Sequence, residues 1–202
     1  MNYLKVKRHI IDKNSFLFSS IIIFVSLILS YLIYLNGFSF SFRSIILILL
    51  ILILSLSSLI YIFINLLRCR NFNVLWENRF KKYDICFCKI DIKQDDYKIQ
   101  ALYSSYTATM SSFPKATNAI YIETGEFMLL FFSIKQFGFI QTVLKPFIFL
   151  KNEKISMQKE HLHIIRDFDS IETANGKIII FPNKHGIKEI IIPRNVYYET
   201  LP

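Results

Sequence analysis

The sequence has few cysteines, glycines and prolines, and two long stretches of it have no charge at all. Its three cysteines, Cys69, Cys86 and Cys88, are too sparse for a disulfide framework, so nothing requires an oxidising compartment. With 5 glycines and 5 prolines in 202 residues, long flexible linkers are not expected. The absence of charge from these two stretches is the most informative, because the chain as a whole is strongly basic, with a formal net charge of +9.

The uncharged stretches are residues 16–35 and 44–67. A helix rises about 1.5 Å per residue, so about 20 apolar residues cross a hydrocarbon core of about 30 Å. A single segment in lipid satisfies its own backbone hydrogen bonds only as a helix. A cleaved signal peptide is disfavoured, because the first stretch lacks a small-x-small cleavage site and a second stretch follows. The sequence therefore predicts a two-helix transmembrane hairpin over residues 16–67.

Flanking charge predicts the orientation of this hairpin. Basic residues outnumber acidic ones before the first stretch and directly after the second, whereas the connecting segment 36–43 carries Arg43 alone. The positive-inside bias then places both termini in the cytoplasm, and a bacterial inner membrane is the expected location.

Four serines lie within the two apolar stretches: Ser26 and Ser30 in the first, Ser55 and Ser58 in the second. Small residues let helices approach closely, so we expect these serines to pack between the helices. Their hydroxyls bond either across the helix pair or back to their own helix. No ionisable group lies within either stretch, which disfavours a polar conduit.

Residues 68–82 connect the hairpin to the rest of the chain and contain the only tryptophan. One interpretation is an amphipathic segment at the inner headgroups, and the other is a plain continuation of the second helix. Under the first interpretation the lipid or partner contacts are Arg68, Arg70, Trp76, Arg79, Lys81 and Lys82.

From residue 83 to residue 202 the pattern favours strands in a cytoplasmic domain. Short β-branched and aromatic runs alternate with turn residues, as in Thr124-Gly125 and Ala174-Asn175-Gly176. Residues 91–96 and 104–115 are polar and are expected to be loops. The predicted strands are 85–92, 97–103, 119–123, 127–133, 139–143, 147–150, 161–166, 177–181 and 188–192.

Two parts of this domain resemble each other. Each begins with Ile-Glu-Thr, at residues 122–124 and 171–173, and ends with proline beside a basic residue. If the similarity is more than chance, the domain consists of two related β-meanders around one core.

The stretch 131–150 is more apolar than a half-exposed sheet requires. We expect most of it to lie in the core. The alternative is a turn that exposes Phe137 and Phe139 to the membrane or to a partner.

Two motifs stand near the end of the chain: Asp-Phe-Asp-Ser-Ile-Glu at residues 167–172 and Ile-Ile-Pro-Arg-Asn-Val at residues 191–196. Together with the layout of a hairpin followed by strands, they resemble the YcxB-like proteins, small bacterial membrane proteins with a β domain related to pleckstrin-homology (PH) and GRAM-type folds. Phe168 stands where the family usually has tryptophan, and the family's final helix is almost absent. The resemblance implies an α+β membrane protein: a transmembrane hairpin followed by a mostly antiparallel, PH-like barrel or sandwich.

Catalytic and metal-binding motifs are missing from the sequence. It has no phosphate-binding loop, dinucleotide fingerprint or nucleophile elbow. His161 with His163, and Cys86 with Cys88, place two ligand types on one strand face, but not at the spacing of a zinc finger or ribbon. We therefore expect no enzyme, no metal and no cofactor.

The expected function is a non-catalytic adaptor, anchored in the inner membrane, whose PH-like domain binds a protein partner or lipid headgroups. The alternative is a membrane immunity or defence accessory protein that associates through its hairpin with another membrane protein or with a second copy. Nucleic acid is not an expected partner, because the aromatic residues mostly alternate as core positions.

Overall fold

The computed structural model describes residues 3–11, 13–35, 42–94, 98–100, 107–109, 115–136, 140–151, 162–184 and 186–194. The chain divides into two compact units, which are described separately. The first unit comprises residues 1–75 with 134–143, and the second comprises residues 76–133 with 144–202. The sequence predicted a basic amino-terminal segment over residues 1–15 and further boundaries after residues 67 and 82, so the first unit takes in more of the chain than the hairpin alone.

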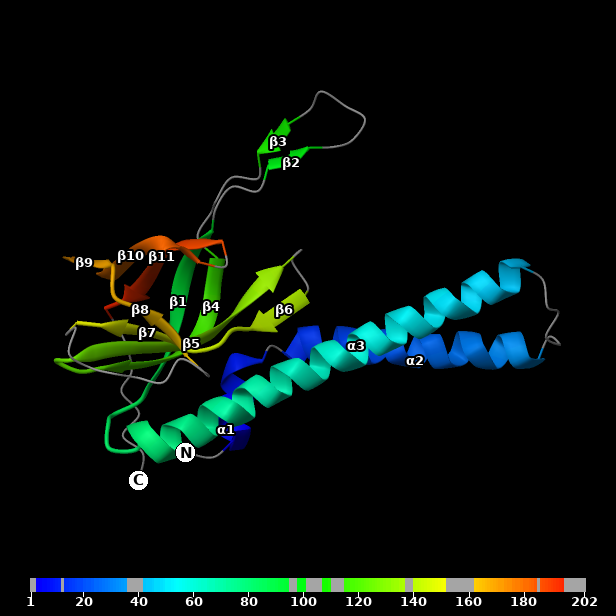
Figure 1. Cartoon of the computed structure of the whole chain (residues 1–202), viewed down its shortest axis with the longest axis horizontal. Coiled ribbons are helices and arrows are strands. Elements are labelled where there is room, and N and C mark those ends of the chain that lie inside the picture. The colour runs from blue at the N-terminus through cyan, green and yellow to red at the C-terminus, as the bar shows by residue number, and fades with distance from the viewer. Residues whose placement is uncertain are drawn as a thin grey trace. The chain divides into compact units, whose positions relative to one another are not determined.

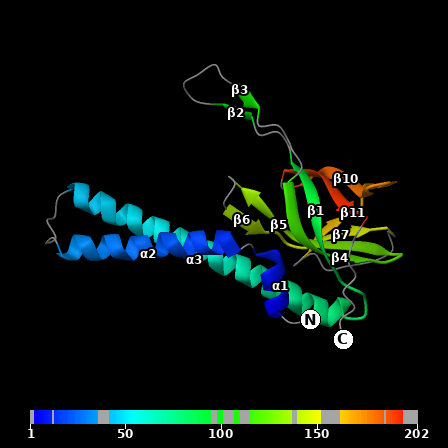
Figure 2. The same ribbon diagram turned by 180° about the vertical axis from the view of Figure 1, so that it is seen from behind.

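The described part of the first unit is mainly helical, with a small amount of β-structure (Figures 1 and 2). Helix α2 (Lys13–Leu35) packs along α3 (Phe42–Leu75), and the short α1 (Tyr3–Ile10) packs against α3 as well. In α1 the residues Val6 and Ile10 are fully buried, one turn apart, which is the expected spacing for a packed helix face. Its β-structure is the strand β6 (Ile140–Val143) and the end of β5 (Phe127–Gln136), from residue 134 onward.

Helix α3 is long and apolar enough to cross a membrane. The helical segment Ile45–Phe80 contains an 18-residue window with a mean hydropathy of 3.0, whereas the apolar part of α2, Ser19–Leu35, is shorter than such a window. Many large apolar side chains on these helices are exposed, including Phe24, Leu27 and Phe63 at 64%, 64% and 66%. Among the described residues, the structure therefore has one candidate span where the sequence predicted two.

The connector predicted at residues 68–82 begins as a continuation of α3. The helix runs without a break through Arg68 and Arg70 to Leu75, and one π-helical turn, η1 (Trp76–Phe80), follows it. Of the two interpretations, the continuous helix matches the structure as far as Leu75.

The second unit is built on a curled, mixed sheet that forms a half-barrel (Figure 1). Its strand order is β8-β7-β5-β4-β1-β11-β10-β9, with β6 paired to β5 off this path, and β2 with β3 forms a separate pair. The registered pairs are antiparallel except β7 with β8, which is parallel. The α+β class with a mostly antiparallel sheet is therefore confirmed. The strands are β1 (Cys86–Gln94), β2 (Lys98–Gln100), β3 (Thr107–Thr109), β4 (Lys115–Glu123), β5 (Phe127–Gln136), β7 (Phe147–Leu150), β8 (His163–Ile165), β9 (Asp169–Thr173), β10 (Gly176–Lys184) and β11 (Ile187–Pro193).

Aromatic side chains fill the inside of the half-barrel. Phe149 of β7 and Phe181 of β10 have ring centroids 5.3 Å apart, although several strands separate β7 from β10 in the sheet. Phe147 stacks on Phe132 at 5.3 Å in the same cluster. The sheet therefore curls far enough for its two arms to share one core. The large apolar side chains described within residues 131–150 are buried, whereas Phe137 and Phe139 lie outside the described residues.

Each of the nine predicted strand ranges overlaps a strand, but two strands were missed and two loops were wrong. The predicted loop at 91–96 is strand as far as Gln94, and the loop at 104–115 contains β3 and the start of β4. Strand β9 was not predicted because all five of its residues are exposed, so it has no alternation of buried and exposed positions. Pairing with β10, rather than local propensity, makes it a strand.

The two Ile-Glu-Thr segments occupy matching places in the sheet. Each ends a strand and enters a tight turn, β4 to β5 in one case and β9 to β10 in the other. Thr124 donates its hydroxyl to the Phe127 carbonyl at 3.1 Å, and Thr173 donates to the Gly176 carbonyl at 2.8 Å. The similarity seen in the sequence thus corresponds to the same local turn chemistry.

The two hairpin glycines make a matched test. Gly176 has φ +146°, and a Cβ there would lie 2.0 Å from the Ile192 carbonyl oxygen, whereas a Cβ at Gly125 would meet nothing within 4 Å. We expect Gly176→Ala to lower the free energy of unfolding by about 2 kcal/mol or more, and Gly125→Ala by less than about 1 kcal/mol. Thermal unfolding of the detergent-purified protein measures both. Equal effects would show that the close approach at Gly176 does not constrain the sheet.

Candidate lipid-interface site

A stripe of polar side chains on α3 binds the main chain of β6. Tyr61, Asn65 and Arg68 lie at positions i, i+4 and i+7, and therefore on one face of the helix. Asn65 uses both ends of its amide: Nδ2 donates to the Gln141 carbonyl at 3.1 Å, and Oδ1 accepts from the Val143 N–H at 2.9 Å. The α3 helix thus supplies β6 with the partners that a neighbouring strand otherwise provides.

Tyr61 and Arg68 extend this contact on either side of Asn65. The Tyr61 hydroxyl donates to the Gln141 carbonyl, and the Arg68 guanidinium donates to the Val143 carbonyl. Gln141 in turn donates from Nε2 to the Ile10 carbonyl at 2.8 Å, where α1 ends. One connected set of hydrogen bonds therefore joins α1, α3 and β6.

Asn65 provides a direct test of this set. In Asn65→Ala the buried N–H of Val143 loses its partner, and we expect a loss of about 1–3 kcal/mol of unfolding free energy. Ser57→Ala is the control, because the exposed Ser57 hydroxyl only bonds the Leu54 carbonyl of its own helix. Denaturation in mild detergent measures the two variants side by side, and equal stability would show that the contact with β6 contributes little.

A groove of about 560 Å³ lies between α1 and α3 in the same unit. Its size is within the usual range for small-molecule sites, roughly 300–1,000 Å³. The lining is mostly apolar, with one guanidinium, one phenol and one carboxamide. The lining residues are Tyr3, Phe63, Leu66, Leu67, Arg70, Asn73 and Val74.

The residues predicted from the sequence to contact lipid lie in different environments. Arg70 lines the groove, whereas the Arg68 guanidinium donates a hydrogen bond to the Val143 carbonyl. Trp76 is buried in the second unit, with 4% of its surface exposed. Arg79, Lys81 and Lys82 are exposed, and the Lys82 ammonium lies 5.0 Å from the centre of the Tyr83 ring.

The span serines bond mainly to their own helices. Ser26 donates to the Ile22 carbonyl at 2.7 Å, Ser30 to Ser26 at 2.8 Å, and Ser55 to Ile51 at 2.9 Å. Ser26 and Ser58 are buried, which fits close helix packing, while Ser30 is exposed. The sequence left two possibilities, a hydrogen bond across the helix pair or one within the same helix. These three hydroxyls donate within their own helices.

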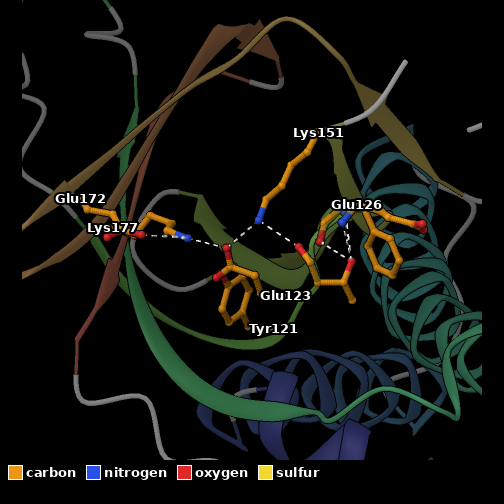
Figure 3. Close-up of polar contacts among 8 residues, drawn as sticks. Tyr121, Glu123, Glu126, Lys151, Glu172 and Lys177 are labelled. Carbon is orange, nitrogen blue, oxygen red and sulfur yellow. Dashed lines mark hydrogen bonds and ion pairs between the residues drawn. The ribbon is translucent and has the colours of Figure 1, made fainter. Parts of the chain in front are cut away.

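The second unit has an ionic cluster centred on Glu123 (Figure 3). The Glu123 carboxylate accepts from the Tyr121 hydroxyl, from Lys177 and, at 2.9 Å, from Lys151. Lys177 also lies 3.7 Å from Glu172, its register partner on β9. The cluster therefore joins β4, the end of β7, β9 and β10, which are strands from both arms of the half-barrel.

This cluster holds Glu123 ionised. Partial burial acts to raise the pKa of Glu123, but hydrogen bonds from Lys177, Tyr121 and Lys151 outweigh it and lower the pKa to about 2. A carboxylate with so low a pKa is not a proton donor near neutral pH. The cluster can tie strands together, and it does not supply general acid chemistry.

The low pKa of Glu123 predicts an acid-dependent loss of stability. Because its folded pKa lies below the ordinary value of 4.5, the stabilisation is complete above that value and is lost as the pH falls toward about 2. We expect Glu123→Gln to remove this part of the pH dependence and to cost about 1 kcal/mol at pH 7. Thermal melts between pH 7 and pH 2.5 measure it, with Glu126→Gln in the same β4–β5 turn as the control. An unchanged pH profile in Glu123→Gln would contradict the assignment.

The described members of the cysteine and histidine pairs, Cys86, Cys88 and His163, lie in strands of the sheet. Cys86 and Cys88 are buried in β1, and burial, with a contribution from Cys86, raises the pKa of Cys88 to about 12. A protonated, buried thiol is a small apolar side chain rather than a nucleophile. His163 packs 5.0 Å from the Phe147 ring, and His161 lies outside the described residues. Within the described ranges, no group of three or more histidine, cysteine or acidic residues is arranged to hold a metal ion.

The polar stripe and the groove were not found from the sequence, apart from Arg68 and Arg70. The signal for the stripe was nevertheless present, because Asn65 is the only amide within the apolar stretch 44–67. A polar side chain in such a stretch is expected to face protein rather than lipid.

No family model, curated protein or solved structure matches the chain. The resemblance to YcxB-like proteins therefore stays a prediction.

Proposed function

We propose that this protein is a non-catalytic binding protein anchored in the bacterial inner membrane. In this proposal α2 and α3 both cross the bilayer as a hairpin, both termini are cytoplasmic, and the β-rich unit is a PH-like domain that binds a protein partner or lipid headgroups.

The observation that carries the proposal is the change along α3 from an exposed apolar surface to basic residues. Its uncharged run over residues 44–67 exposes large apolar side chains, and Arg68 and Arg70 follow in the same unbroken helix. Exposed apolar surface of this extent is stable in lipid and not in water. The arginines come where the headgroups begin, which is the place that the positive-inside rule expects.

Two features favour a second crossing by α2. Its uncharged stretch, residues 16–35, extends about 30 Å at 1.5 Å per residue, which is about the hydrocarbon thickness. Its described apolar side chains are also largely exposed, and it packs along α3. A membrane of about 30 Å is then crossed twice, and the connecting segment with Arg43 lies outside.

A reporter fused to the carboxyl terminus of the full chain tests this topology. We expect a cytoplasmic reporter such as a fluorescent protein to be active there and a periplasmic alkaline phosphatase to be inactive. We also expect the protein to remain in the membrane through carbonate extraction. Active phosphatase at the carboxyl terminus, or release by carbonate, would contradict the proposal.

Crosslinking in intact membranes separates the adaptor from its alternative. For the adaptor, charge reversal of the exposed Lys81 and Lys82 should abolish a crosslinked partner, and Ser26→Leu with Ser55→Leu in the helices should not. The opposite pattern would favour an immunity or defence accessory protein that associates through its transmembrane hairpin.

A further inference from the structure

The groove between α1 and α3 changes from apolar to basic along α3. Phe63, Leu67, Arg70 and Val74 lie at positions i, i+4, i+7 and i+11, and therefore along one helix face. At 1.5 Å per residue, Phe63 and Arg70 are separated by roughly 10 Å along the helix axis. The groove thus has an apolar end at Phe63 and Leu67 and a cationic end at Arg70, where Asn73 and Val74 complete the lining.

The apolar end of the groove belongs to the uncharged run of α3. Phe63 and Leu67 lie within residues 44–67 and expose 66% and 41% of their surface. If α3 crosses the membrane, these side chains lie at the depth of the acyl chains, where lipid or another transmembrane helix reaches them. Arg70, three residues beyond the run, then lies at the depth of the phosphates.

The cationic end offers donors that suit a phosphate. Arg70 is exposed, and within the part of the chain that the structure describes it forms no hydrogen bond or ion pair. Its planar guanidinium matches two phosphate oxygens. Burial raises the pKa of Tyr3, with Cys69 adding to the rise and Arg70 opposing it, so the phenol remains a hydrogen-bond donor at neutral pH.

From this arrangement we propose that the groove binds one anionic phospholipid of the inner leaflet. The phosphate lies at Arg70 and Tyr3, and an acyl chain lies against Phe63 and Leu67. The proposal rests on the membrane crossing of α3 put forward above. It assigns a single, fixed lipid to the groove, in contrast to the exchanging lipids that surround any membrane helix.

Native mass spectrometry of the full-length protein in mild detergent tests this inference. The protein is titrated with phosphatidylglycerol or with phosphatidylcholine. We expect one phosphatidylglycerol to bind per chain and to bind more tightly than phosphatidylcholine, whose headgroup is zwitterionic. Arg70→Gln should weaken phosphatidylglycerol binding about tenfold and largely abolish the preference between the two lipids. Phe63→Ala should weaken the binding of both lipids.

Arg8→Gln is the matched control, because it removes the same charge from an exposed position of α1 that does not line the groove. We expect it to bind phosphatidylglycerol as the wild type does. Arg70→Lys keeps the charge without the planar fork and should bind with intermediate affinity. Thermal melts of all variants establish that each is folded before its lipid binding is compared.

Three results would overturn the inference. If the wild type bound the two lipids equally, the groove would have no site for an anionic headgroup. If Arg8→Gln and Arg70→Gln weakened binding equally, the effect would come from general surface charge and not from the groove. Competition by millimolar inorganic phosphate would point to a soluble anion instead of a lipid. Carbonate extraction separates the two proposals: a protein that stays in the membrane without binding phosphatidylglycerol contradicts only the groove, whereas a protein released from it contradicts both.

Discussion

Asn65 uses both ends of its side-chain amide on the main chain of β6, and the first unit depends on this contact. A backbone edge next to an apolar helix needs hydrogen-bond partners, because an unsatisfied buried N–H or C=O costs about 1–3 kcal/mol. Tyr61 and Arg68 satisfy the neighbouring carbonyls, and Gln141 carries the set on to α1. Four side chains thereby fix the strand, both helices and the groove between them.

The second unit solves a different problem. A sheet that curls without closing has two arms, and something must hold them together. Phe149 and Phe181 do so inside the half-barrel, where aromatic rings from β7 and β10 meet at 5.3 Å. Glu123 does so through Lys151 and Lys177, which come from the two arms. The first contact is apolar and independent of pH, whereas the second depends on an ionised carboxylate.

A common chemical logic connects the groove with the proposed role. A binding protein held in a membrane does not need catalytic groups, but it needs a surface whose polarity changes where the bilayer changes. Helix α3 provides that surface, from Phe63 through Leu67 to Arg70. A bound anionic lipid would occupy the cationic end and cover apolar surface that is otherwise exposed. The groove and the polar stripe lie on the same helix, α3. A lipid bound in the groove would therefore contact the helix that also binds the main chain of β6.

Sequence alone determined the features that depend on local composition. The uncharged run of α3, the α+β class, nine strand ranges and both glycine-containing turns follow from hydrophobicity, periodicity and turn chemistry. The tertiary structure decided the features that depend on pairing between distant residues. Strand β9 has no buried face of its own and exists because β10 pairs with it. Asn65 and Gln141 are 76 positions apart, and Phe63 lines a groove with Tyr3 from the start of the chain, so no local pattern brings these residues together. Local periodicity reports which face of an element is apolar, but it carries no information about which distant segment will cover that face.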